Sequence, residues 1–374
     1  MRKFQALLEK EKHIVFYSEG PTYWVHLEPL VQHLLSDHQV PICYLSSAPD
    51  DPGLDCLKAY GTAFLIGDGA VRNVLFKTLP NSVLVMTMPD LNTFHIKKSD
   101  NSVHYVYVHH SINSTHMIYN AHAFDHFDTI FCVGPHHITE TRKQEQLYNL
   151  PVKNLFKHGY GRLDTLTSLT SSMRDNHSRK NVGRPLHVLL APSWGNNDFL
   201  NDHGQALADS LLGEGFYLTI RPHPQTVLQS PSTLSKLRNM YSKNPYVVLE
   251  DNVVSAESLF LSDILITDWS GVATEFAYCL ERPVLFIDAP RKINNPNYLS
   301  LDIVPLEIHI RNVIGSVLSL DSLHKAPEEI KRLYKDRQLI KDKIRESSNH
   351  WIYNRGASGA KGAKELVKIF NEFN

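Results

Sequence analysis

The chain has 374 residues, which is enough for two domains that each bury a core of their own. Apolar residues make up 42% of the chain and charged residues 21%, the composition of a soluble globular protein. The formal net charge of −1 lacks the basic excess that nucleic-acid binding requires, so we expect no nucleic-acid partner.

Cysteine spacing and the pattern of apolar runs indicate where the protein works. The four cysteines are scattered and form no CxxC pair, which argues against a disulfide framework or a zinc site and fits a reducing cytoplasm. Charges interrupt every short apolar run of the first twenty residues, so we expect no signal peptide. No run approaches the ~18–20 apolar residues that span a bilayer. We therefore expect a cytoplasmic protein whose contact with the cytoplasmic membrane is at most peripheral.

The N-terminal half alternates short β-rich runs with helical patterns. A helix is expected at 25–35, and strands are expected at 13–17, 41–45, 63–66, 83–88, 103–108 and 129–133. Runs that are apolar throughout are typical of parallel strands buried on both faces. The alternation therefore predicts a doubly wound α/β domain over residues 1–165.

A polar, Ser/Thr-rich stretch at 166–186 follows and ends in Gly-Arg-Pro, which predicts a linker. The alternation then resumes, with helices expected at 202–212 and 232–241 and strands at 187–191, 217–221, 247–250, 264–267 and 284–287. We therefore expect a second α/β domain over 187–326, facing the first across a central cleft. Charged helices at 327–374 would pack back across the domains. This is the two-domain architecture that GT-B glycosyltransferases have.

The first candidate site residues follow the strand at 103–108. In open α/β sheets, ligands bind beyond the C-terminal ends of the strands, and His109 and His110 stand there. Histidine titrates near neutral pH, so either residue suits a general base. The structural alternative is a packed, hydrogen-bonded histidine. The sequence leaves open which of the two would face the cleft.

Eight histidines between His104 and His137 raise the question of a metal site. His122 and His126 are spaced i, i+4, as two ligands on one helix face would be. The chain has no HExxH motif, so polar surface and capping histidines are the preferred interpretation and no metal site is predicted. No pair of acids has divalent-ion spacing either. No cofactor is assigned, and a divalent-cation requirement stays open.

Two more candidate stretches follow strands of the second half. Ser193 and Trp194 offer a hydroxyl and an aromatic face that could approach a phosphate and stack a base, or form a plain turn with a buried Trp. Arg221 and His223 stand two apart on a proline-restricted segment, so they would point to the same side. Together they would suit a phosphate, with a turn and a surface His as the alternative.

The fourth stretch is ILITDWSGVATEFAYCLERPVLFID, residues 264–288. A strand ends at Asp268, and Ser270 and Gly271 stand where the next helix begins, so its N–H groups would face an anion. Glu275 lies one turn inside that helix and could reach a ribose diol. A capped helix without a ligand is the alternative. Taken together, the four stretches indicate an enzyme that acts on a nucleotide diphosphate compound.

These motifs resemble those of a known family. APSW (191–194), RPHP (221–224), TDWSGVATEFAYCLERPVLFID (267–288) and YNRGASGAKGAKEL (353–366) together resemble the CDP-glycerol glycerophosphotransferases, the teichoic-acid primases and polymerases. The resemblance implies a GT-B-like fold and a CDP-glycerol or other CDP-alditol donor. It implies transfer of the alditol phosphate to a hydroxyl of a cell-surface glycan or lipid-linked polymer, with release of CMP.

The resemblance also implies roles for the candidate residues. His110, or else His109, would be the base on the acceptor side, in the N-terminal domain. The nucleotide side, in the C-terminal domain, would use His223 and Arg221 at the phosphates and Ser193, Trp194, Asp268, Ser270, Gly271 and Glu275 around the nucleotide. The family's aromatic–Arg pair reads Trp194-Gly195 here, which removes a cation.

Two other functions stay open from the sequence alone. A GT-B glycosyltransferase or an enzyme like UDP-N-acetylglucosamine 2-epimerase would also place an acid after an Asp-Ser-Gly turn, but the epimerases' Gly-Thr-Arg-Pro-Glu pattern is missing. A non-catalytic nucleotide-binding subunit is the other alternative. The acceptor, the alditol and the oligomeric state are not fixed by the sequence.

Overall fold

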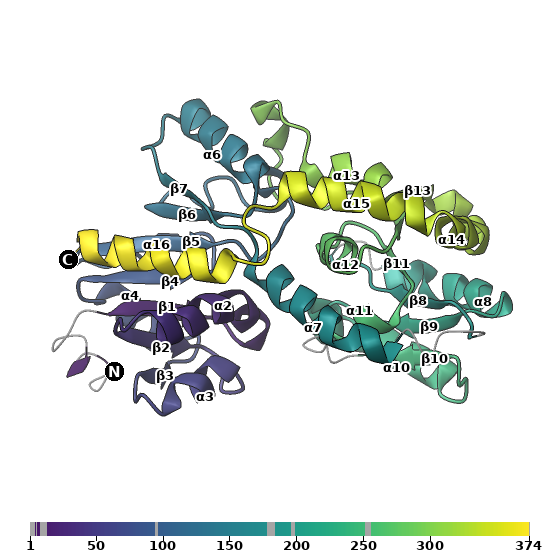
Figure 1. Ribbon diagram of the computed structural model, residues 1–374, viewed down its shortest axis with the longest axis horizontal. Coiled ribbons are helices and arrows are strands. Elements are labelled where there is room, and N and C mark those ends of the chain that lie inside the picture. The colour runs from purple at the N-terminus through teal and green to yellow at the C-terminus, as the bar shows by residue number, and fades with distance from the viewer. Residues whose placement is uncertain are drawn as a thin grey trace. The chain divides into compact units, whose positions relative to one another are not determined.

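The structure is a computed structural model that describes residues 4, 6–7, 13–93, 96–177, 184–195, 199–250 and 256–373. The chain divides into two compact units, each with its own parallel sheet (Figure 1). The first unit comprises Met1–Thr165, Asn294–Ile303 and Trp351–Asn374, and the second comprises Leu166–Ile293 and Val304–His350. The sequence prediction of two doubly wound α/β domains is confirmed.

The described part of the first unit holds a seven-stranded parallel sheet in the order β3-β2-β1-β4-β5-β6-β7. Its strands are β1 (Ile14–Ser18), β2 (Ile42–Ser46), β3 (Ala63–Leu65), β4 (Ser82–Met86), β5 (Val103–Val108), β6 (Thr129–Cys132) and β7 (Asn154–Lys157). Its helices are α2 (Pro21–Asp37), α3 (Pro52–Lys58), α4 (Ala70–Lys77), α5 (Thr115–Ile118), α6 (Pro135–Tyr148) and α16 (Ser358–Phe373).

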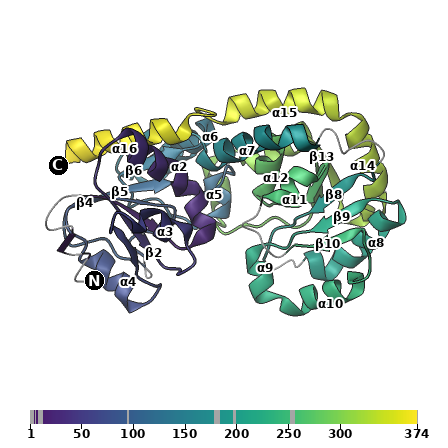
Figure 2. The ribbon, with the colours of Figure 1, turned by 60° about the horizontal axis from the view of Figure 1, so that its bottom comes forward.

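Two apolar layers cover this sheet, because neighbouring residues of each strand point to opposite faces. Ile14 and Phe16 of β1 pack with α2 and α16, whereas Val15 and Tyr17 of the same strand pack with α4. The C-terminal helix α16 lies against α2, as Figure 2 shows. Glycines make this approach possible, since a Cβ on Gly362 would come within 2.4 Å of a side-chain carbon of α2.

The described part of the second unit holds a six-stranded parallel sheet in the order β10-β9-β8-β11-β12-β13. Its strands are β8 (His187–Leu190), β9 (Tyr217–Ile220), β10 (Val247–Leu249), β11 (Ile264–Thr267), β12 (Val284–Asp288) and β13 (Gly315–Ser319). Its helices are α8 (Gln205–Gly213), α9 (Pro224–Gln229), α10 (Pro231–Tyr241), α11 (Glu257–Leu261), α12 (Val272–Leu280), α13 (Leu306–Ile314), α14 (Ala326–Lys335) and α15 (Arg337–Trp351).

The stretch expected to be a linker, 166–186, is helical in its first part. Helix α7 (Gly161–His177) runs through it, and 178–183 lie outside the described residues. Leu163, Leu166 and Thr170 are buried at helical spacing, which gives the Ser/Thr-rich segment one buried face. The Thr170 hydroxyl also donates to the Leu166 carbonyl at 2.8 Å, so a polar residue is accommodated inside the helix.

No helix in the described part of the chain is long and apolar enough to cross a membrane.

Candidate active site

Each sheet has one point where the strand order reverses. The predicted site residues of each unit lie near the reversal point of that unit's own sheet. In the first unit β1 pairs with β2 on one side and β4 on the other; in the second, β8 pairs with β9 and β11. Ligands of open α/β sheets bind at such switch points. Ser193 and Asp268 follow β8 and β11 directly, whereas His110 follows β5 and contacts the end of β4.

His110 is half-buried, and its ring is held in one tautomer. Its Nδ1 lies 3.0 Å from the carbonyl oxygen of Thr87, which can only accept, so Nδ1 carries the hydrogen of the neutral ring. Nε2 then presents its lone pair to the Tyr119 hydroxyl at 3.2 Å. Burial lowers the pKa of His110 to about 4, although the Thr87 carbonyl opposes this. At pH 7 His110 is therefore a neutral imidazole whose Nε2 is the basic nitrogen.

His109, the other candidate base, lies inside the first unit. It is 3% exposed, and its ring centroid is 4.9 Å from that of Tyr107 and 3.8 Å from that of His137. Neither ring nitrogen hydrogen-bonds within the described part of the chain. Burial lowers the pKa of His109 well below its ordinary value. A substrate cannot reach a fully packed ring, so His110 is the more accessible of the two candidate residues.

The neighbouring histidines hold the loop that follows His110. On α6, His136 and His137 place Nε2 at 2.8 and 2.9 Å from the carbonyl oxygens of Ile112 and Asn113. Since a carbonyl only accepts, both nitrogens donate. Buried Glu140 of the same helix accepts two hydrogen bonds, at 2.7 and 2.6 Å, from the first residue of α5. The cluster therefore fixes the backbone on the C-terminal side of His110.

The His122 and His126 pair does not lie on a helix face. Residues 121–126 form turns, His122 has a φ of 68°, and its Nδ1 lies 2.7 Å from a carboxylate oxygen of Asp125. Within the described ranges, no three His, Cys, Asp or Glu side chains are grouped to hold a metal ion. His122 therefore has a side-chain partner of its own, and it is not one of two ligands on a helix face.

Glu19, which the sequence analysis did not single out, stands at the end of β1 beside the switch point. Burial raises its pKa to about 7, and the Arg72 guanidinium opposes the rise. Burial and the Glu19 carboxylate raise the pKa of Tyr23 to about 12, and the Tyr23 ring lies 5.7 Å from that of His110. Glu19 directly follows the first strand, and this position is the sequence signal that could have identified it. This edge of the sheet thus holds a carboxyl that is partly protonated near neutral pH.

In the second unit, Ser193 and Asp268 bind each other across the switch point. Asp268 is 5% exposed and accepts from both the backbone N–H and the hydroxyl of Ser193, each at 2.7 Å. One residue earlier, the Thr267 hydroxyl donates to the Ala191 carbonyl at 2.7 Å. These bonds join the loops after β8 and β11. Asp268 and Ser193 therefore shape the edge of the site, and their oxygens are already engaged.

His223, Trp194 and Lys292 form a second cluster at this edge. His223 Nδ1 accepts from the backbone N–H of Gln225 at 3.1 Å, so in the neutral ring Nε2 carries the hydrogen and can donate. Burial, reinforced by nearby Lys292, lowers the pKa of His223 to about 4. The Trp194 ring centroid is 5.9 Å from that of His223, and Lys292 Nζ lies 3.6 Å from the Trp194 centroid. Lys292, from the loop after β12, was not predicted from the sequence.

Arg221, which the sequence analysis expects at a phosphate, is buried and has protein partners. It is 7% exposed, its guanidinium donates to the Ser258 hydroxyl at 3.0 Å, and it lies 3.8 Å from a Glu250 carboxylate oxygen. A buried charge needs such partners; here α11 supplies Ser258, and the segment after β10 supplies Glu250. Arg221 and His223 thus have separate environments, although both follow β9.

Helix α12 begins at Val272, where the sequence predicts a helix start. The Ser270 hydroxyl accepts a long hydrogen bond of 3.4 Å from the Val272 N–H, and Gly271 has a helical φ of −61°. Glu275 lies half-buried in the first turn. Ser270, Gly271 and Glu275 therefore stand together at the positive end of the helix.

Trp269 has a structural role that the sequence did not indicate. Its indole N–H donates to the Ala289 carbonyl at 2.7 Å, and the Arg311 guanidinium lies 3.9 Å from its ring centroid. Arg311 in turn donates to the Asp288 carboxylate at 2.7 Å. Trp269 thereby links the loop after β11 to the loop after β12, from which Lys292 comes.

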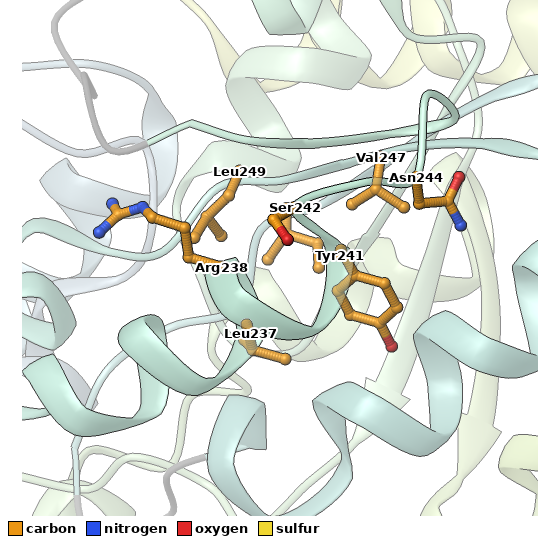
Figure 3. Close-up of a pocket in the computed structure, with 8 residues that line it drawn as sticks. Leu237, Arg238, Tyr241, Ser242, Asn244, Val247 and Leu249 are labelled. Atoms are coloured by element: carbon orange, nitrogen blue, oxygen red, sulfur yellow. The ribbon is translucent and has the colours of Figure 1, made fainter.

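The second unit also has a cavity of about 190 Å³ away from these residues. Residues of α10 and of the edge strand β10 line it (Figure 3), and β10 is two strands from β8 in the sheet. Leu237, Tyr241, Val247 and Leu249 are among its lining residues, and no predicted site residue lines it. The candidate site is therefore defined by strand ends rather than by this cavity.

Comparisons with known proteins agree on family and fold. The profile described as CDP-Glycerol:Poly(glycerophosphate) glycerophosphotransferase matches residues 77–291, more than half of the chain. A search of curated proteins finds no match to the sequence.

Solved structures show the same architecture. One of the Wall Teichoic Acid Polymerase TagF has 12% identity and a TM-score of 0.63, covering 96% of this chain and 89% of that one. A TagF variant soaked with CDPG has 14% identity, the same TM-score and the same coverage. A UDP co-structure of MnaA from S. aureus has 12% identity and a TM-score of 0.62, covering 97% and 98%. At such identities the likeness establishes a GT-B-like fold, and the profile match establishes the family. The chain belongs to the CDP-glycerol:poly(glycerophosphate) glycerophosphotransferase family.

Proposed function

We propose that this protein transfers glycerol phosphate, or a related alditol phosphate, from a CDP-alditol to a hydroxyl group of a polymer acceptor and releases CMP. Membership of the family supports the reaction type. The observation that carries the proposal is the fixed tautomer of His110, which is neutral and presents Nε2 as a base at a strand end. A neutral imidazole nitrogen can accept the proton of a hydroxyl nucleophile, which is the part a general base plays.

The proposed step is an in-line displacement at the β-phosphorus, the one that carries the alditol. Nε2 of His110 takes the proton of the acceptor hydroxyl as its oxygen bonds to the phosphorus. The bond from that phosphorus to the bridging oxygen breaks, and CMP leaves with the electron pair. A positioned base contributes ~10²–10⁴-fold to such a rate. The anionic diphosphate would raise the pKa of His110 from about 4, which strengthens the base when substrate is bound.

On the donor side, we assign the phosphates to His223, Lys292 and the start of α12. His223 offers an Nε2–H donor, and Lys292 offers a cation above Trp194. Phosphoryl transfer depends mainly on positioning and on stabilising charge at the leaving oxygens, which suits these groups. Glu275 would accept from the ribose hydroxyls. Lys292 would replace the cation that the Trp194-Gly195 turn lacks.

On the acceptor side, we assign Glu19 to recognition of the incoming polyol. Its position after β1, at the switch point, places it at the same edge of the sheet as His110. A carboxyl with a pKa of about 7 can both accept and donate hydrogen bonds, so it suits an alditol with neighbouring hydroxyls.

The test is the nucleotide that the protein releases. The protein is incubated with a polyol phosphate acceptor and with CDP-glycerol, CDP-ribitol or UDP-N-acetylglucosamine in parallel, and products are separated by anion exchange. CMP from a CDP-alditol, matched by growth of the acceptor, is the expected result. UDP release would favour a UDP-sugar enzyme, since MnaA shares the fold. A thermal shift with CDP-glycerol but no CMP from any acceptor would indicate a nucleotide-binding subunit.

A further inference from the structure

The first unit carries a groove of about 840 Å³ that the proposed reaction does not use. One wall is the edge strand β7, with Phe156 and Lys157, and the other is the C-terminal helix α16. On α16, Lys361, Lys364 and Lys368 line the groove. Their i, i+3 and i+7 spacing places them on one helix face, at steps of roughly 5 and 6 Å along the axis.

The charges in this groove are predominantly positive. Four lysines and two glutamates line it, which leaves a formal charge of +2 in a chain whose total is −1. Lys368 lies 3.8 and 3.9 Å from the carboxylates of Glu365 and Glu372, so the two acids neutralise the end of the groove. Lys157 lies 5.5 Å above the Tyr353 ring centroid, and the side chain of Lys364 is exposed. Lys361 donates to the neutral side-chain oxygen of Asn354 at 2.6 Å, so this contact does not cancel its charge. The lysines other than Lys368 therefore keep a positive charge that an anion can meet.

The groove also has an apolar part. Phe156 and Val367 line it beside Lys157 and Lys368 in the sequence, and both are half-buried. A ligand that matches this surface has negative charges at intervals and short hydrocarbon segments between them. A chain of alditol phosphates has this chemistry, because each phosphate is followed by a carbon backbone. A free phosphate ion would leave the apolar part unused.

We infer that this groove binds the poly(alditol phosphate) acceptor, holding a stretch of the polymer away from its reacting end. The identity of the occupant rests on the proposed function, whereas the charge pattern stands without it. Affinity should then increase with acceptor length, because longer chains reach more of the lysines. It should also fall as salt is added, since exposed charges are screened over about 10 Å at 0.1 M.

The test compares a double charge reversal with a matched control. Lys157→Glu/Lys364→Glu alters the groove, and Lys236→Glu/Lys243→Glu makes the same charge change at exposed lysines of the second unit. Binding of short and long glycerol phosphate oligomers is measured by calorimetry without any donor. The groove variant should bind the long oligomer at least about tenfold more weakly, and the control within about twofold of the unaltered protein. The neutral pair Lys157→Gln/Lys364→Gln should give an intermediate loss of affinity for the long oligomer. It shows whether the loss in the charge-reversed variant comes from charge or from misfolding.

The outcomes separate this inference from the proposed function. If the protein binds the oligomer through the groove but releases no CMP, the groove stands and the proposed function is wrong. If the groove variant binds the long oligomer as well as the control does, the inference is overturned. It is also overturned if the groove lysines are needed for binding to phosphatidylglycerol vesicles while the oligomer is not bound. In activity assays, the KM of the groove variant should rise for the long acceptor and stay unchanged for the shortest one.

Discussion

The Ser193–Asp268 pair gives a quantitative test of how the second switch point is built. In Asp268→Asn the one remaining acceptor oxygen can serve the Ser193 backbone N–H, while the Ser193 hydroxyl must turn to accept from the amide N–H₂, so both charge-assisted bonds become neutral ones. Hydrogen bonds to charged groups contribute about 1.5–3 kcal/mol each, and both bonds here are 2.7 Å long at a residue that is 5% exposed. We therefore expect Asp268→Asn to lower the free energy of unfolding by about 2–3 kcal/mol. Asp268→Ala loses both bonds and should cost roughly 3–5 kcal/mol.

The assay for this pair combines urea unfolding with donor kinetics. Ser193→Ala is the matched control, because it removes the hydroxyl bond and keeps the backbone N–H bond, and it should cost about 1–2 kcal/mol. Because the pair joins the loops after β8 and β11, Asp268→Asn should also raise KM for the CDP-alditol. The double variant should be less destabilised than the sum of the single variants, since the two residues share one interaction.

One result would refute this reasoning about Asp268. If Asp268→Asn unfolded at the same urea concentration as the unaltered protein while its donor affinity fell a hundredfold, the carboxylate would act on the ligand. The hydrogen bonds to Ser193 would then contribute nothing measurable to the loop.

Three further predictions concern pH, the donor cation and the backbone. Burial lowers the folded-state pKa of His110 and His158 to about 4, so between pH 6.5 and 4 the unfolded chain binds more protons, and the urea midpoint should be lower at pH 5 than at pH 7.5. A midpoint that is constant over this range would contradict the buried neutral histidines. Lys292→Gln should raise KM for a CDP-alditol about tenfold and leave cytidine binding unchanged, whereas Lys292→Arg should restore most of the loss, as competition assays would show. Gly159→Ala should cost on the order of 3–4 kcal/mol in urea unfolding, because φ is +98° and a Cβ would lie 2.2 Å from a backbone oxygen. Gly356→Ala, with φ of +75° and open space, should cost only about 1 kcal/mol, and equal losses would rule out the steric contribution.

The central strands could be predicted from the sequence because they are buried on both faces. Residues 103–108 and 264–267 have the predicted bounds, since each is an apolar run between polar residues. Strands β7 and β13 were missed. Both are edge strands with partly exposed residues, so they lack a continuous apolar run. Their pairing with β6 and β12 is a tertiary property that local sequence does not carry.

The candidate site was predictable in its position along the chain but not in its contacts. Strand ends could be located, and with them His110, His223 and the start of α12. The difference between His109 and His110 lies in the burial of His109 and in the bond of His110 to the Thr87 carbonyl, which follows a different strand, β4. Likewise, Lys292 is far from Trp194 in sequence and lies over its ring only in the folded unit. Contacts between distant loops fix protonation and partners, and no local pattern encodes them.

The most direct test of the central claim is CMP release by His110→Ala, measured beside the Kd for CDP-glycerol. A lost base should lower the turnover at least ~10²-fold, while Kd changes by less than about threefold, because the base acts on the acceptor and not on the donor. We expect His223→Ala also to lower turnover more than donor binding. Near wild-type turnover in both variants would contradict the proposed mechanism.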